Sequence, residues 1–228
     1  MVKPHHRPLA AYRVLSYICI ALLFTAFLLS LLIAVSLPIL KPIYLLRFFS
    51  VANNGQPATS IATELRFGVW GVCANSVLDE PTVFTNDGEC FGPQLGYTVP
   101  DSIISLTGIS PSIVSVVLRA LLVVLILHPI AAALSFLALV SSLFLASHAF
   151  SILALALALF AALLSTVVFV IDIALVLVAK SQVSQIPTFQ FAIEWGNAPW
   201  MGLAAAVLTW LAVGTLSARA CYCLGVRR

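Results

Sequence analysis

The chain has 228 residues, of which 62% are hydrophobic and 8% are Asp, Glu, Lys or Arg, with a formal net charge of +3. In an ordinary soluble domain about a quarter of the residues are charged, whereas the mean hydropathy of this chain is +1.12. These values exclude a soluble globular protein and predict an integral membrane protein.

Four segments are long and apolar enough to cross a hydrocarbon core of about 30 Å, which takes about 20 helical residues. In chain order they are residues 14–40, 111–140, 149–179 and 200–224. The segments around them are 1–13, 41–110, 141–148, 180–199 and 225–228. We therefore predict a mainly α membrane protein, a four-helix transmembrane bundle with a small extracellular β-sheet in the first loop.

The distribution of basic residues predicts the orientation of this bundle. The loop 41–110 holds three basic and six acidic residues, a net charge of −3. The two ends of the chain carry basic residues with no acidic residue beside them: Lys3, Arg7, Arg13, Arg219, Arg227 and Arg228. Because Lys and Arg accumulate on the cytoplasmic side, we expect a multi-pass plasma-membrane protein with cytoplasmic termini and both loops, 41–110 and 180–199, outside.

The N-terminal region also admits a second interpretation. The sequence KPHHR, the apolar run after it and Ala34-Val35-Ser36 together resemble a cleavable signal peptide. The apolar run is longer than the usual apolar region of such a peptide, and its removal would leave an odd number of spans. Both points favour a retained first span.

The long loop contains its own strand and turn signals. In residues 61–70, apolar and charged side chains alternate, which predicts a strand with one solvated face. The run 43–51 predicts a second strand, and residues 53–55 (NNG) favour a hairpin turn between them. Further strands are expected around Phe84 and Tyr97. The expected apolar face of the strand 61–70 is Ile61, Thr63, Leu65, Phe67 and Val69, opposite Glu64 and Arg66.

Cys73 and Cys90 lie in this loop, on the predicted outer side of the membrane. Because that side is oxidising, the two thiols are expected to form a disulfide, which stabilises by about 3 kcal/mol. A metal site is the alternative, but no neighbouring His completes a ligand set. We therefore expect no metal and no cofactor.

The sequence GVWGVC at residues 68–73, followed by Cys90 and a second span, resembles the G-L-W-x-x-C…C signature of the claudin-like tetraspan superfamily. Within that superfamily, the chain is similar to the fungal PalI family. The similarity lies in the signature, where Gly68 and Trp70 are followed by Gly71, in LHPIAAALSFLAL of the second span and in FVIDIALVL of the third. Relatives of PalI include the eisosomal tetraspans. The resemblance implies a four-span protein connected with the response to ambient pH. No Trp precedes Trp70 in the loop, unlike in claudins, which argues against a junction-forming role.

Two charged residues lie deep in the predicted spans. Arg119 and Asp172 are each about 11 to 12 Å below the predicted outer helix ends. A charge at this depth needs a partner or water, so we predict an ion pair between neighbouring helices, with a proton or ion relay as the alternative. Small residues on the same helix face as Asp172 predict close helix packing. They are Ala154, Ala158, Ala162 and Thr166.

His128 and Pro129 lie near the middle of the second span. Proline removes a backbone hydrogen bond, so we expect a kink there, and the adjacent imidazole suggests a pH-sensitive site. In the alternative interpretation, His128 only binds a freed backbone carbonyl. Cys221 and Cys223 lie beside basic residues at the inner boundary and are candidates for palmitoylation, with two reduced thiols as the alternative.

The sequence contains no nucleotide-binding loop and no nucleophile–base motif, so we expect that the chain is not an enzyme. The leading hypothesis is a PalI-like accessory protein that assists the localisation or stability of a multi-span ambient-pH receptor. The alternatives are an eisosome-like organiser of membrane domains and cell wall, and an ion pathway or transporter subunit that uses Asp172. The expected partners are the lipid bilayer and a membrane protein that lies beside the chain. This neighbour can be a second copy of the chain, which would give a homo-oligomer. We expect no binding to nucleic acid.

Overall fold

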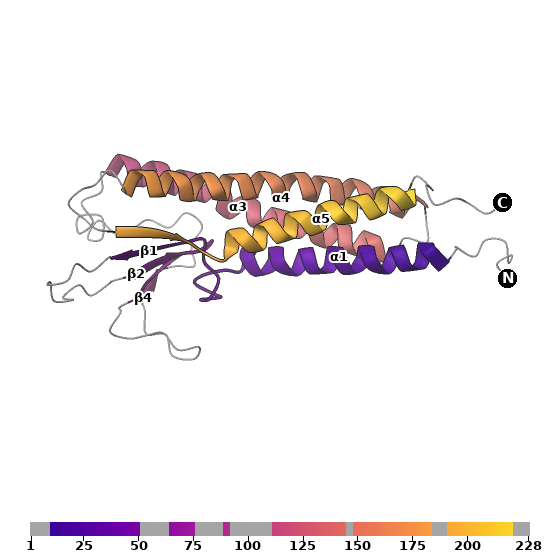
Figure 1. Cartoon of the computed structure of the whole chain (residues 1–228), viewed down its shortest axis with the longest axis horizontal. Helices are drawn as coiled ribbons and strands as arrows, with labels where there is room; N and C mark the ends of the chain where they lie inside the picture. The colour runs from indigo at the N-terminus through magenta and orange to yellow at the C-terminus, as the bar shows by residue number, and fades with distance from the viewer. Residues whose placement is uncertain are drawn as a thin grey trace. The chain divides into compact units, whose positions relative to one another are not determined.

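The computed structural model describes residues 10–50, 64–75, 89–91, 111–144, 148–183 and 191–220. This part of the chain contains four long apolar helices, which Figure 1 shows as coiled ribbons. They are α1 (Ala10–Ala34), α3 (Pro111–Leu143), α4 (His148–Val183) and α5 (Ala198–Ala220). Each contains a segment long and apolar enough to cross a membrane. The chain is therefore a multi-pass membrane protein.

Five strands form one antiparallel sheet in the described part of the chain. They are β1 (Leu46–Ser50), β2 (Glu64–Phe67), β3 (Val72–Asn75), β4 (Glu89–Phe91) and β5 (Phe191–Trp195), in the order β4-β3-β2-β1-β5. Four strands come from the loop between the first two spans, and β5 comes from the loop between the last two. The predicted fold class, mainly α with a small sheet in the first loop, is confirmed. The contribution of β5 was not predicted.

The register of the sheet separates an apolar row from a charged one. The predicted pairing of the strands in 43–51 and 61–70 is confirmed, because β1 and β2 are antiparallel neighbours. The predicted turn at 53–55 and the strands around Phe84 and Tyr97 lie outside the described residues.

One cross-strand row is Trp195, Leu46, Phe67, Val72 and Phe91. The next row, on the opposite face, is Glu194, Arg47, Arg66, Cys73 and Cys90.

The chain divides into two compact units. The helical unit comprises Met1–Leu31, Pro129–Val167 and Gly202–Arg228, and the sheet unit comprises Leu32–His128 and Val168–Met201. In α3 the division falls between His128 and Pro129, the residue at which we predicted a kink.

The helical unit has a core of small and aliphatic side chains from all four helices. Its members are Cys19 and Leu23 of α1, Ala138 of α3, Ala154 and Ala158 of α4, and Ala212 and Leu216 of α5. Alanines at such positions let helix backbones approach closely. The burial of the predicted stripe on α4 is confirmed for its three alanines, since Ala154, Ala158 and Ala162 are all fully buried.

The sheet unit has a separate core, in which the sheet packs against helix ends. Its buried members are Ile33 at the end of α1, Ala198 at the start of α5, and Ile43, Leu45, Val69 and Val72 from the first loop. Trp70 and Met201 are among the partly buried side chains around this core. The apolar face of the sheet is therefore covered by the residues where α1 ends and α5 begins.

Candidate functional site

The GVWGVC signature forms the connection between β2 and β3. The N–H of Gly68 donates to the carbonyl of Gly71 at 2.9 Å, which closes a tight turn. Val69, between them, is fully buried in the core of the sheet unit. The signature therefore reverses the chain while it inserts a side chain into the core.

This turn also binds the residues that end α1. The indole Nε1–H of Trp70 donates to the carbonyl of Ala34, the last residue of α1. The backbone N–H of Trp70 donates to the carbonyl of Leu37 at 3.1 Å, and that of Val69 to the Ser36 hydroxyl at 3.0 Å. Helix ends leave carbonyls without an intrahelical partner. The signature supplies donors to α1 and to the turn directly after it.

Glycine is required at position 68 by the closeness of this contact. A Cβ at Gly68 would lie less than 3.0 Å from Leu37 atoms, among them its Cα and carbonyl oxygen. Backbone atoms at that distance cannot be avoided by a change of rotamer. The first Gly of the signature therefore permits the turn to lie directly on the backbone that follows α1.

A second set of contacts joins the two loops. The Asn197 side chain accepts a hydrogen bond from the N–H of Tyr44 at 3.0 Å and donates to the carbonyl of Pro42 at 2.7 Å. The N–H groups of Gly196 and Ala198 donate to the carbonyls of Leu45 and Tyr44 at 2.9 and 3.1 Å. Sequence reasoning missed these residues, because nothing local indicates a partner about 150 positions away.

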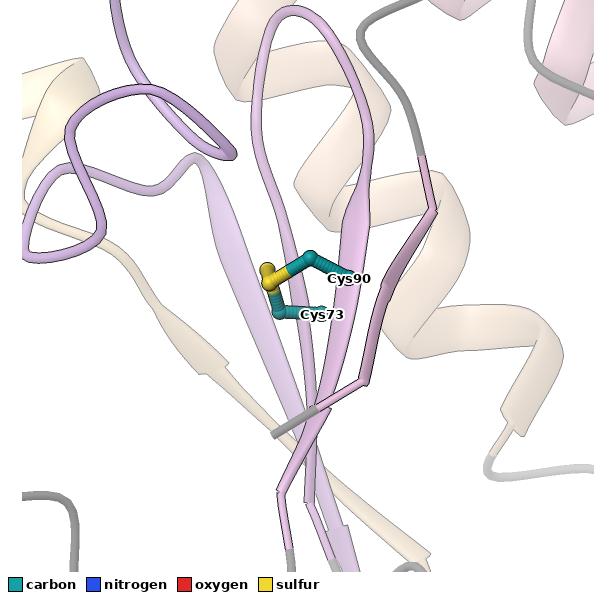
Figure 2. The surroundings of a disulfide bond; sticks show 2 residues. All are labelled: Cys73 and Cys90. Atoms are coloured by element: carbon teal, nitrogen blue, oxygen red, sulfur yellow. A yellow bond between two sulfur atoms is a disulfide. The ribbon is translucent and has the colours of Figure 1, made fainter. Parts of the chain in front are cut away.

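The disulfide between Cys73 and Cys90 is present, as predicted. Figure 2 shows the two sulfur atoms joined between neighbouring strands. The cysteines are directly opposed residues of β3 and β4, and Cys73 is buried. The bridge therefore fixes β4, the last of the described strands on that side of the sheet, to β3, in which the signature ends.

The same row of the sheet carries charges beside the disulfide. Arg47 contacts Glu194 across β1 and β5, with 3.5 Å between Nη1 and Oε2, and both side chains are partly exposed. The Arg66 guanidinium lies 5.2 Å from the centre of the Tyr44 ring, which is within the range of a cation–π interaction. Solvent screens such exposed pairs. These charges therefore favour the correct pairing of the strands more than they stabilise the folded state.

Within the helices, the structure brings together two ionisable residues that were not predicted to meet. Nε2 of His128 lies 3.4 Å from Oδ2 of Asp172, and the side chains are 5% and 1% exposed. Neither carboxylate oxygen of Asp172 makes a hydrogen bond to a described residue. The side chain of Arg119 is not among those described, so its ion pair with Asp172 stays a prediction. Arg119 precedes His128 by nine residues, about 13.5 Å along an ideal helix.

The remaining predicted sites are not tested by this geometry. Pro129 lies inside α3, and a pH-sensitive kink there stays a prediction. Cys221 and Cys223 lie outside the described residues, so their palmitoylation also stays a prediction. Among the described residues, no three His, Cys, Asp or Glu side chains come together as a metal-ligand group would.

A model of the SUR7/PalI family matches residues 13–220. The matched segment includes the signature, both cysteines of the disulfide and the four candidate membrane spans of the described helices. No curated protein matches the chain.

Proposed function

The chain belongs to the SUR7/PalI family, and from that premise we propose that it is a four-span accessory protein of the plasma membrane that acts through lateral partners. Tetraspan proteins of this family are non-catalytic membrane proteins. By resemblance to PalI, the chain assists the localisation or stability of a multi-span receptor for ambient pH. The observation that carries the proposal is the family match over residues 13–220.

The contacts in the sheet unit support an accessory role. Trp70 bonds the first loop to Ala34 at the end of α1, and Gly68 lets the loop lie against Leu37. Asn197 joins the second loop to the first. A sheet held in this way presents a fixed surface on the predicted outer side. The helices carry large exposed apolar side chains, among them Phe160, Val170 and Leu211. Such side chains suit contact with lipid or with another membrane helix.

A second candidate function is the organisation of membrane domains and cell wall, as in the eisosomal relatives of PalI. The family match favours it equally, because the SUR7/PalI model spans both groups. In this role the lateral partner includes further copies of the chain. The third candidate, an ion pathway, is favoured by the buried His128–Asp172 contact alone.

Proximity labelling in the native membrane tests the leading proposal. A labelling enzyme is fused to the full chain, and the labelled neighbours are identified by mass spectrometry. An unrelated four-span protein with the same fusion is the control for general membrane neighbours. A multi-span receptor and its trafficking proteins, enriched over this control, support the accessory role, and deletion of the chain should then lower the amount of that receptor at the surface.

The other results decide between the alternatives. Neighbours dominated by membrane-curving scaffold and wall-synthesis proteins, in clusters that persist without any receptor, support the organiser instead. Loss of a measured ion flux in Asp172→Asn, at unchanged protein level, is required by the ion pathway. If the receptor keeps its surface level after deletion of the chain, the accessory role is wrong.

A further inference from the structure

Basic side chains of α1 and α5 come together at one end of the helical unit. Nη1 of Arg219, in the last turn of α5, donates a hydrogen bond to the Ser16 hydroxyl of α1. Arg13 precedes Ser16 by three residues, which places both on the same side of α1. We propose that Arg13 and Arg219 bind the phosphate group of an anionic phospholipid, and that Ser16 holds Arg219 in position for it. This inference goes beyond the proposed function and does not depend on it.

The charges of the helical unit favour an anion that comes from outside the protein. The three segments of this unit contain six Lys or Arg residues and no Asp or Glu, a side-chain charge of +6. All eight acidic residues of the chain belong to the sheet unit, which also contains five basic ones. The bond to Ser16 positions the Arg219 guanidinium without neutralising its charge, because a hydroxyl is neutral. The helical unit therefore attracts anions and has no carboxylate side chain of its own to offer.

Both arginines lie at the end of a candidate membrane span. The spans of α1 and α5 are Arg13–Ala34 and Ala198–Ala220. Arg13 is thus the first residue of one span, and Arg219 is the last but one of the other. Figure 1 shows that α1 begins where α5 ends, at the same end of the two helices. Because the polar headgroups lie directly outside the hydrocarbon core, the two guanidinium groups are at the depth of lipid phosphates.

The side chains next to Arg13 favour a lipid over a free phosphate ion. Tyr17 follows Arg13 by four residues, on the same side of α1, and is 73% exposed. Val14 and Ile18 are exposed as well. Tyrosine is enriched at the membrane interface, and exposed apolar side chains of a span contact acyl chains. A phospholipid can therefore contact the arginines with its phosphate and the apolar side chains with an acyl chain, whereas a free ion contacts the arginines alone.

The chemistry of arginine explains why the lipid should be anionic. A guanidinium forms two parallel hydrogen bonds with a phosphate group and stays charged at physiological pH. Arg13 is exposed and Arg219 is partly buried, so Arg13 is open to a headgroup while Arg219 is held against α1. Two positive charges favour phosphatidylserine, whose net charge is negative, over phosphatidylcholine, whose phosphate is already neutralised by its own choline group. Basic residues beside a span attract anionic lipids for the same reason.

The test is lipid binding by the full chain, purified in neutral detergent. The thermal unfolding midpoint is measured while phosphatidylserine, phosphatidylcholine or inorganic phosphate is added, because a ligand of the folded state raises the midpoint as it binds. We expect phosphatidylserine to raise the midpoint at lower concentrations than phosphatidylcholine, and inorganic phosphate to have no comparable effect. Each basic residue near an anionic lipid contributes a factor of about five in affinity. Arg13→Gln and Arg219→Gln should therefore each weaken phosphatidylserine binding about fivefold.

Lys180→Gln is the matched control, because Lys180 is exposed in the last turn of α4 and belongs to the sheet unit. It should leave the affinity for phosphatidylserine unchanged. Arg13→Gln decides the test even if Arg219→Gln does not fold, since Arg13 is exposed. The proposal is wrong if phosphatidylcholine binds equally well, if inorganic phosphate raises the midpoint as much, or if Arg13→Gln binds as the wild type does. It is also wrong if Lys180→Gln weakens binding as much as Arg13→Gln, because the lipid then responds to total charge alone.

Discussion

Trp70, on the turn between β2 and β3, donates its indole N–H to the carbonyl of Ala34, the residue at which α1 ends. A carbonyl at a helix C-terminus lacks an intrahelical donor and must find another. The Trp of the signature therefore has a specific task, because it terminates the first span and attaches the sheet to it.

Trp70→Phe should destabilise the protein by about 1–3 kcal/mol, the usual cost of leaving a buried acceptor unsatisfied. The phenyl ring keeps most of the apolar contact but has no N–H. The measurement is the free energy of unfolding in detergent micelles. Trp200→Phe is the matched control, because Trp200 is largely exposed, and it should change stability by no more than about 0.5 kcal/mol. Equal effects of the two variants would contradict a specific role for the indole N–H.

Gly68→Ala should destabilise the protein by about 1–3 kcal/mol, as overpacking of a tight contact usually does. The new Cβ would lie less than 3.0 Å from backbone atoms of Leu37, so the turn after α1 must move. Gly214→Ala is the control, since nothing lies within 4 Å of a Cβ there. That variant should be neutral or stabilising by up to about 1 kcal/mol, because alanine favours a helix. A neutral Gly68→Ala would show that the contact with Leu37 is not tight.

Local sequence patterns were sufficient to predict the parts of the structure that depend on residues close together in the sequence. The alternation in residues 61–70 assigned Leu65 and Phe67 to one face of β2 and Arg66 to the other, and the register confirms that separation. The continuous apolar runs identified the four helices for the same reason, because length and hydropathy are properties of one segment.

Long-range pairing could not be predicted in the same way. The segment FAIEW has large apolar residues at every second position and could have been recognised as a strand. Its partner β1 is nevertheless more than 100 residues away in sequence, and no local rule selects it. The bonds of Asn197 to Tyr44 and Pro42 depend on that pairing.

The predicted depth of Asp172 depended on the residue at which its helix ends. Counting from Ala179 placed Asp172 seven residues below the helix end, level with Arg119. The helix α4 continues to Val183, which moves its end by about 6 Å. The described contact of Asp172 is with His128, a residue that was not predicted to meet it.

Removal of the disulfide by Cys73→Ser with Cys90→Ser should cost about 3 kcal/mol, the chain-entropy value for a loop of this length. The bridge closes a sequence separation of 17 residues. Unfolding is compared with and without reductant, and the double variant should be insensitive to it. Cys19→Ala is the control, because Cys19 is a free buried thiol and its variant should keep the full response to reductant. A response that persists in the double variant would contradict the assignment.

Ala158→Leu should destabilise the helical unit by about 1–3 kcal/mol. Ala158 is fully buried in the core that contains Leu23 of α1, Ala138 of α3 and Leu216 of α5. A leucine there must displace a neighbouring helix, because the small side chain is what allows the helices to approach. Ala174→Leu is the matched control on the same helix, since Ala174 is exposed. Added apolar surface at an exposed position of a membrane span contacts lipid at little cost, so the control should keep the unfolding midpoint of the wild type. If both variants unfold at that midpoint, the core of the helical unit tolerates larger side chains and the close packing of α4 is not required for stability.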